Sequence, residues 1–198
     1  MARIAIDMDE VIADSLSEYL SRYNADFGQN MTKENLMGQR LADLVSPEYW
    51  PRLDSYFDDA NFFKNLEVME SSQDVVRELA GYYEIFIVTA AMEIPCSFVP
   101  KFEWLQRHFP FIPPDNYVFC GNKGVIAADY LIDDNVYQLQ RFEGQGIIYT
   151  SPRNIHEKGF PRVNNWREVR EVFLRGGKDG IAHRFEVGST LRASQEAI

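Results

Sequence analysis

Four short apolar segments constrain the fold of this chain more than any other feature of its sequence. They are Arg3–Asp7, Glu84–Thr89, Tyr130–Asp133 and Gly146–Thr150, with Tyr117–Cys120 as a weaker fifth segment. Their apolar residues follow one another almost continuously instead of alternating with polar ones, which is typical of strands buried on both faces of a parallel sheet. The sequence therefore predicts a sheet whose strands are covered by helices on both sides.

Helical patterns separate these segments. Apolar residues recur at helical spacing over Ser71–Tyr83, Phe98–Phe109, Asn135–Phe142 and Trp166–Leu174. An order of strand, helix, strand repeated in this way is typical of a doubly wound α/β domain. We therefore expect the α/β fold class, with a Rossmann-like parallel sheet.

One interval is too long for a simple crossover, since about seventy residues separate the first strand from the second. It opens with an amphipathic helical pattern over Ser15–Phe27 and later gathers many aromatic residues. We interpret residues 16–70 as a small helical cap inserted after the first strand, and residues 1–15 and 71–175 as the α/β core. Residues 176–198 form a tail of unknown role.

Composition narrows the class of protein. The chain has 198 residues, is 45% hydrophobic and carries a net charge of -10, with 30 acidic against 20 basic residues. This balance argues against binding to a nucleic-acid duplex, which depends on clustered Lys and Arg. No apolar run is long enough to span a bilayer, and the N-terminal apolar run is too short for a signal peptide. With two cysteines and no disulfide framework, we expect a soluble, cytoplasmic protein.

Two carboxylates, Asp7 and Asp9, stand where the first predicted strand ends. Ligands of parallel α/β sheets bind outside the carboxyl ends of the strands. Carboxylates so close together repel each other, and oxygen ligands of this kind suit Mg²⁺. The alternative is that Asp7 only caps the helix that follows.

A second acidic pair, Asp133 and Asp134, ends another predicted strand and therefore falls at the same edge of the sheet. Adjacent carboxylates in a partly buried place are costly unless a cation or hydrogen bonds compensate them. The alternative is an acidic cluster at a helix start, with Asp134 or Asn135 as the cap.

Two further residues suit an anionic substrate. Thr89 ends the second predicted strand, where its hydroxyl and the following backbone N–H groups could bind an anionic oxygen. Lys123 precedes the second acidic pair by ten residues and could neutralise a phosphate oxygen. Each of the two, taken alone, would be an ordinary strand-end threonine or loop lysine. Together with four carboxylates they favour phosphoryl transfer through an aspartyl-phosphate.

The sequence resembles the haloacid dehalogenase-like phosphatases and, among them, the 5′(3′)-deoxyribonucleotidases. The resemblance covers most of residues 1–175 in the same order. It rests on the segments DMDEVIAD at 7–14, NFFKNLE at 61–67, IVTA at 87–90, KFEWLQRHF at 101–109, NKGVIAADYLIDD at 122–134 and NNWREV at 164–169.

This resemblance implies a role for each matching residue. Asp7 would be the nucleophile, and Asp9 the general acid and then the base that activates water. Mg²⁺ would be held by the Asp7 side chain, the Asp9 backbone carbonyl and Asp133, with Asp134 bound directly or through water. The phosphate would be held by Thr89, Ala90 and Lys123.

Three residues depart from what the vertebrate enzymes of this family usually carry. Glu10 stands in the place of a Gly, Ser15 in that of a Phe and Ala90 in that of a Ser. The phosphate chemistry should survive these changes, whereas the preference among nucleotides is open because Ser15 and Ala90 would lie near the substrate. Whether Glu10 touches the substrate or caps a helix is also open.

The cap supplies candidates for substrate binding. Phe62 and Phe63 could stack on a nucleobase, although a pair of aromatic residues is more often part of a core. Lys101 could be a second phosphate contact, but we expect it to be a surface charge.

We therefore expect a Mg²⁺-dependent phosphomonoesterase that acts on deoxyribonucleoside monophosphates, with no membrane partner. The alternative within the class is a phosphatase of a sugar phosphate or another small metabolite. A phospho-accepting receiver domain and a catalytically silent scaffold are the alternatives outside it. A homodimer through the cap or the tail is left open.

Overall fold

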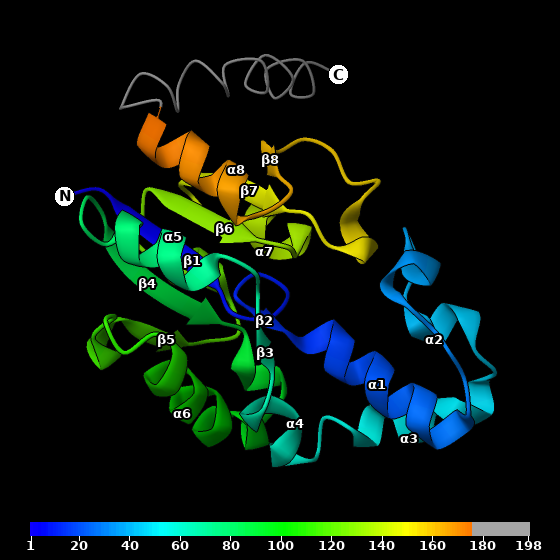
Figure 1. The fold of residues 1–198 in the computed structure, drawn as a ribbon. Helices are drawn as coiled ribbons and strands as arrows, with labels where there is room; N and C mark the ends of the chain where they lie inside the picture. The colour runs from blue at the N-terminus through cyan, green and yellow to red at the C-terminus, as the bar shows by residue number, and fades with distance from the viewer. Residues whose placement is uncertain (176–198) are drawn as a thin grey trace.

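The computed structural model describes residues 1–175 and has a six-stranded parallel sheet at its centre (Figure 1). The strand order is β5-β4-β1-β6-β7-β8, and every neighbouring pair is parallel. The predicted α/β class and Rossmann-like sheet are confirmed. The strands are β1 (Arg3–Asp7), β4 (Glu84–Thr89), β5 (Tyr117–Phe119), β6 (Tyr130–Asp133), β7 (Gln145–Tyr149) and β8 (Arg162–Val163).

The last strand of this sheet, β8, was not predicted from the sequence. It has only two residues, Arg162 and Val163, which pair with Ile148 and Tyr149 of β7 at the edge of the sheet. Two residues are too few to form a recognisable apolar run. The pairing of β8 is determined by its neighbour β7 and not by a pattern of its own.

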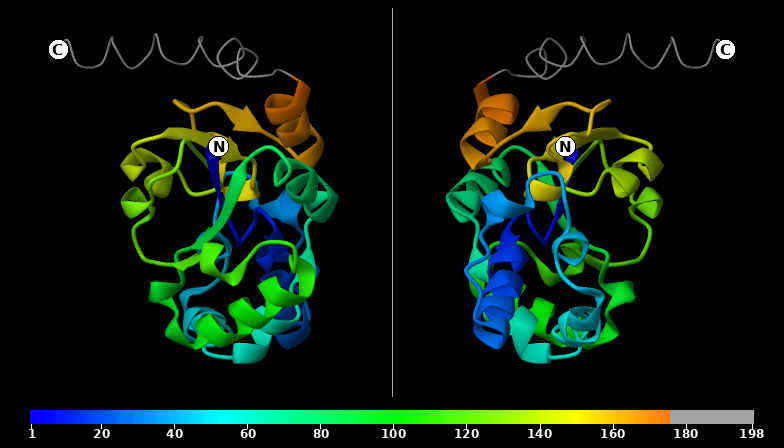
Figure 2. Two further views of the ribbon diagram at one scale, coloured as in Figure 1. Left: turned by 90° about the vertical axis from the view of Figure 1, so that its left-hand side faces the viewer. Right: turned by 90° about the vertical axis from the view of Figure 1, so that its right-hand side faces the viewer.

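Helices cover both faces of the sheet. On one face lie α5 (Ser72–Leu79), α6 (Phe98–His108) and α8 (Trp166–Arg170), and on the other lies α7 (Val136–Arg141). Figure 2 shows α5 and α8 on the side of the sheet opposite to α7. The helix predicted to reach Leu174 ends at Arg170 and continues as a π-helical turn over Glu171–Arg175.

The two faces of the sheet have separate apolar cores. Ile6 and Ile87 pack with Trp104 of α6 and Trp166 of α8 in the larger core. The smaller core on the opposite face contains Leu131 of β6 and the apolar residues of α7. Because alternate residues of each strand belong to opposite faces, both sets must be apolar, which explains the continuous apolar runs in the sequence.

The long interval after β1 contains four helices that lie beyond one end of the sheet (Figure 1). Its two ends are joined by the antiparallel strands β2 (Ala13–Asp14) and β3 (Glu67–Val68). We call residues 15–66 the helical cap. That the cap and the α/β core are separate domains stays a prediction. The α-helices of the cap are α1 (Ser15–Phe27), α2 (Leu41–Leu44), α3 (Trp50–Ser55) and α4 (Ala60–Lys64).

The first cap helix has the bounds that its sequence pattern predicts. The Asp14 carboxylate caps its N-terminus by accepting a hydrogen bond from the Ser17 backbone N–H at 3.0 Å. Gly28 ends it in the left-handed conformation, with φ of 61°. Along its inner face, Leu20 and Tyr23 are buried.

The predicted tail, residues 176–198, lies outside the described residues. Within residues 1–175, no helix combines the length and the apolar character that a membrane crossing requires.

Candidate active site

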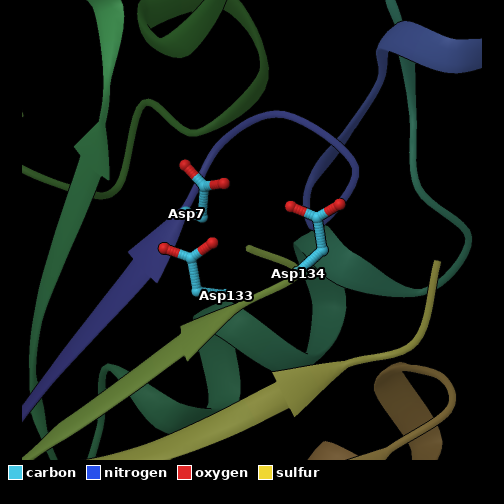
Figure 3. A group of neighbouring side chains, drawn as sticks. All are labelled: Asp7, Asp133 and Asp134. Atoms are coloured by element: carbon cyan, nitrogen blue, oxygen red, sulfur yellow. The ribbon is translucent and has the colours of Figure 1, made fainter. Parts of the chain in front are cut away.

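The strand order places a topological switch point between β1 and β6. From β1 the chain continues to β4 and β5 on one side, and then returns to β6 on the other side of β1. Asp7 is the last residue of β1 and Asp133 the last residue of β6. Figure 3 shows both side chains at this edge of the sheet, with Asp134 directly beyond β6. Crevices at such switch points are where open α/β sheets bind ligands.

Three carboxylates meet at the switch point. One oxygen each of Asp7, Asp133 and Asp134 lies within 4.8 Å of the others, and all three residues are buried. Burial and the neighbouring Asp133 raise the pKa of Asp7 well above its usual value. Burial also raises the pKa of Asp134, in spite of a nearby arginine. The repulsion among these groups and their oxygen-only chemistry fit a bound divalent cation.

Lys123 already places one positive charge inside this cluster. Its Nζ lies 2.6 Å from Asp7 Oδ1 and donates a 2.6 Å hydrogen bond to Asp133 Oδ2, with 1% of the side chain exposed. Burial lowers the pKa of Lys123, but Asp133 and Asp7 outweigh burial, so that the pKa is raised overall. The Lys123 backbone N–H donates to Gln138 Oε1 of α7, which positions the lysine against that helix. The lysine therefore stays charged between the two aspartates.

Asp9 and Thr89 are joined by a lysine that the sequence analysis placed wrongly. Lys101 Nζ donates to Asp9 Oδ2 and, over 3.0 Å, to Thr89 Oγ1. The expectation that Lys101 is a surface charge is wrong, since 3% of its side chain is exposed. The first turn of α6 brings Lys101 to the carboxyl end of β4, a position that a single lysine in a helical pattern does not reveal.

The Asp9 carboxylate is held by one oxygen only. Its other oxygen, Oδ1, is buried and has no hydrogen-bond partner among residues 1–175. An acceptor left open beside Lys101 and Thr89 can exchange a proton with a bound molecule. Ala90, the other predicted phosphate-binding residue, follows β4 directly and is half-buried.

Arg153 holds Asp134 from the cavity side. Its Nε donates to Asp134 Oδ2 at 2.9 Å and its Nη2 to Asp134 Oδ1 at 2.7 Å. This forked geometry uses both carboxylate oxygens and fixes the plane of the carboxylate. Arg153 could not be predicted as a site residue, because nothing in the sequence of the loop after β7 indicates which carboxylate this loop contacts.

A cavity of about 300 Å³ is lined by residues of the cap and of the core. It adjoins the acidic group through Arg153, which lines the cavity and contacts Asp134. It is lined by Glu10, Ser15, Tyr19, Arg40, Phe57 and Arg153, among others. The rings of Tyr19 and Phe57 stack with centroids 5.3 Å apart and form an aromatic wall. The predicted residue Ser15 thus lines the cavity, and Phe57 does so in place of the two phenylalanines that we singled out.

Those two phenylalanines belong to the interior of the protein. Phe62 and Phe63 of α4 are 0% and 2% exposed and pack edge to face, with centroids 4.9 Å apart. The Phe63 ring also lies 5.0 Å from Lys101 Nζ. Neither ring lines the cavity, so this structure provides no surface on which Phe62 or Phe63 could stack a base.

The loop between α1 and α2 reaches the core close to this cavity. Gly38 donates its N–H to the Pro152 carbonyl at 2.8 Å and has a φ of +77°. A Cβ at this position would lie 2.5 Å from the exposed His156 ring, which would have to move, and the positive φ also favours glycine. This contact joins the cap to the loop that carries Arg153.

Comparisons with known proteins identify the family of this chain. The family model described as 5′ nucleotidase, deoxy (pyrimidine), cytosolic type C matches residues 1–178. A Staphylococcus epidermidis protein provisionally named a 5′(3′)-deoxyribonucleotidase is 46% identical over 171 residues, covering 86% of this chain and 95% of that protein. A 5′(3′)-deoxyribonucleotidase of Bacillus subtilis is 39% identical over 173 residues, covering 86% of this chain and 98% of the relative.

Solved structures agree on the fold. The structure of YfnB from Bacillus subtilis, provisionally named a HAD hydrolase and bound to magnesium, matches with a TM-score of 0.53 at 13% identity. The match covers 86% of this chain and 97% of the YfnB chain. At this identity the likeness shows a shared fold, whereas the family model and the curated relatives show the family. The chain therefore belongs to the 5′(3′)-deoxyribonucleotidase family, and it is a phosphoric monoester hydrolase.

Proposed function

We propose that this enzyme hydrolyses deoxyribonucleoside monophosphates to a deoxynucleoside and phosphate, with Mg²⁺ and through an aspartyl-phosphate on Asp7. The observation that carries this proposal is the buried group of Asp7, Asp133 and Asp134 with Lys123 among them, at the switch point of the sheet. The names of the curated relatives support the nucleotide as substrate. A small nucleotide also fits the size of the adjoining cavity.

The first chemical step is a displacement at phosphorus. A carboxylate oxygen of Asp7 attacks the phosphorus atom, and the bond from phosphorus to the ester oxygen breaks. Asp9 donates a proton to that oxygen, so that the nucleoside leaves as a neutral alcohol. Lys101 holds one oxygen of Asp9, which leaves Oδ1 to carry the proton.

The second step returns the enzyme to its starting state. Asp9, now ionised, accepts a proton from a water molecule whose oxygen attacks phosphorus. The bond between phosphorus and the Asp7 oxygen breaks, which releases phosphate and regenerates the carboxylate. Lys123, Thr89 and the backbone N–H groups near Ala90 would hold the phosphate oxygens through both steps.

The proposed metal would be held by Asp7, Asp133, the Asp9 backbone carbonyl and Asp134. When bound, Mg²⁺ neutralises charge on the phosphoryl oxygens and favours the ionised form of the nucleophile. The raised pKa of Asp7 explains why this chain needs such help: burial alone disfavours the carboxylate that must attack.

We propose a cytoplasmic setting, which the free thiols of Cys96 and Cys120 support. A homodimer stays a prediction.

Phosphate release across a panel of substrates tests the proposed function. With Mg²⁺ present, we expect release from deoxyribonucleoside monophosphates, with dUMP and dTMP among the first to assay, and little from sugar phosphates. Ribonucleoside monophosphates of the same bases report on the choice of sugar. Activity restricted to sugar phosphates would keep the chemistry and overturn the nucleotide assignment. No release from any member of the panel would favour a silent scaffold.

Chelation is expected to abolish phosphate release, and added Mg²⁺ is expected to restore it. Mg²⁺ should also raise the melting temperature of the chelated protein, because a cation bound at a 100-fold excess over its Kd stabilises by about 2.7 kcal/mol. Differential scanning calorimetry with and without Mg²⁺ measures this effect. KCl at the same ionic strength is the control for screening. Activity and melting temperature that both ignore the chelator would contradict the metal assignment.

A further inference from the structure

Glu10 has a backbone conformation that a residue with a side chain rarely adopts. Its φ is +59°, and only Ser71 shares a positive φ among the residues other than glycine in the described part of the chain. The left-handed region costs an ordinary residue about 1 kcal/mol or more, so this conformation needs compensation from the surroundings. The turn after β1 thus holds a carboxyl side chain at a position whose φ favours glycine.

The Glu10 side chain is buried and is fastened by one of its two oxygens. Oε1 accepts hydrogen bonds from Ser15 Oγ at 2.9 Å and from the Leu16 backbone N–H at 2.6 Å. Both of these bonds within residues 1–175 end on Oε1, which leaves Oε2 as an acceptor. The residue also lines the cavity between the cap and the core. The carboxylate is thus pre-positioned at the wall of the substrate cavity.

The position of Glu10 in the chain defines which part of a substrate it can meet. It directly follows Asp9, the proposed acid for the leaving oxygen, and it directly precedes the turn into β2 and α1. If the leaving alcohol occupies the cavity that Glu10 lines, a group on that alcohol close to the ester oxygen would be within reach of this side chain. An acceptor there selects for a hydrogen-bond donor on the alcohol.

We propose that Glu10 is a specificity-determining residue that accepts a hydrogen bond from the sugar 3′-hydroxyl of a 2′-deoxynucleoside 5′-monophosphate. This inference rests on the proposed function. The 3′-hydroxyl is the one free sugar hydroxyl of such a substrate and is separated from the ester oxygen by three carbon atoms. The other charged groups of the cavity wall, Arg40 and Arg153, are donors and cannot replace Glu10 in this contact.

The test compares two substrates that differ by one hydroxyl: dTMP and its 2′,3′-dideoxy analogue. Burial raises the pKa of Glu10 to about 7, and the carboxyl group can accept a hydrogen bond in both its ionised and its neutral form. For the unaltered enzyme we expect kcat/KM to favour dTMP by about 10-fold, which is within the range for a single hydrogen bond. The Glu10→Gly variant should bring this ratio to within about twofold of one. Glycine suits the positive φ, so the backbone of the turn is preserved.

A second variant, Glu10→Asn, protects the test against a folding defect of the first. Asparagine tolerates the left-handed region but is too short to reach the same place, so it should lose the discrimination as well. If Glu10 only tethers α1, both variants would lower the melting temperature and the rates on both substrates, with their ratio unchanged. That outcome overturns the inference.

The result for the unaltered enzyme separates the two proposals. Equal kcat/KM on dTMP and its dideoxy analogue would overturn the role of Glu10 and leave the nucleotidase function standing. Absence of phosphate release from both substrates would overturn the proposed function, and the role of Glu10 with it.

Discussion

The Asp7→Asn variant should release no measurable phosphate, with kcat reduced by roughly 10³-fold or more, while it folds as the original does. Removing the attacking group of a covalent mechanism eliminates the pathway, and the residual activity comes only from binding and electrostatics. The melting temperature should be unchanged or raised. Burial already disfavours the ionised form of Asp7, and an amide in its place removes repulsion from Asp133. Lys123 loses its ion pair with Asp7 but keeps its hydrogen bond to Asp133, so the buried lysine is not left without a partner.

Steady-state phosphate release and thermal unfolding, measured on the same preparation, check this prediction. The matched control is Asp115→Asn, an exposed aspartate that precedes β5 and thus lies toward the opposite edge of the sheet. It should behave as the original protein in both measurements. Turnover by Asp7→Asn at more than a few per cent of the original rate would contradict the covalent mechanism.

The Lys123→Met variant should lose both activity and stability. The substitution leaves Asp7 and Asp133 buried without the cation that lies 2.6 Å from each. Removing one partner from a buried ion pair typically lowers the free energy of unfolding by about 3–5 kcal/mol. We expect kcat/KM to fall by about 100-fold or more, because the substitution also removes the positive charge that would neutralise the transferred phosphate.

Urea unfolding with and without Mg²⁺ measures the effect on stability. Mg²⁺ should stabilise Lys123→Met more than the original protein, since the added cation meets two carboxylates that no lysine neutralises. Lys158→Met, which alters an exposed lysine in the loop before β8, is the control and should change neither kcat/KM nor the free energy of unfolding. A Lys123→Met protein as stable as the original would show that Lys123 does not balance the buried charge.

The parallel sheet could be predicted because strands buried on both faces need apolar residues at nearly every position. The predicted bounds of β1, β4 and β6 agree with the structure, and β7 begins one residue earlier. The same reasoning places Asp7 and Asp133 at one edge, since the carboxyl ends of parallel strands coincide. Strands of two residues, such as β2, β3 and β8, lack a pattern and could not be predicted.

The partners of the site residues could not be predicted in the same way. The sequence pattern predicts that Lys101 is exposed on the surface of a helix. Instead, the packing of α6 against the end of β4 buries Lys101 between Asp9 and Thr89. Arg153 is one of several loop arginines until the chain after β7 folds back to Asp134. Likewise, several cap aromatics have similar patterns, and packing decides that Phe57 lines the cavity.

By itself, the sequence determined the fold class, the edge of the sheet at which the acidic residues gather, and the family resemblance. These follow from hydrophobic periodicity and from the order of motifs, both of which are local properties of the chain. Only the tertiary structure decided which charges pair, which aromatic rings remain accessible, and that Glu10 lines the cavity in a left-handed turn. Such contacts join segments far apart in the chain, and their geometry depends on how whole helices and strands pack. A local sequence pattern does not predict this packing.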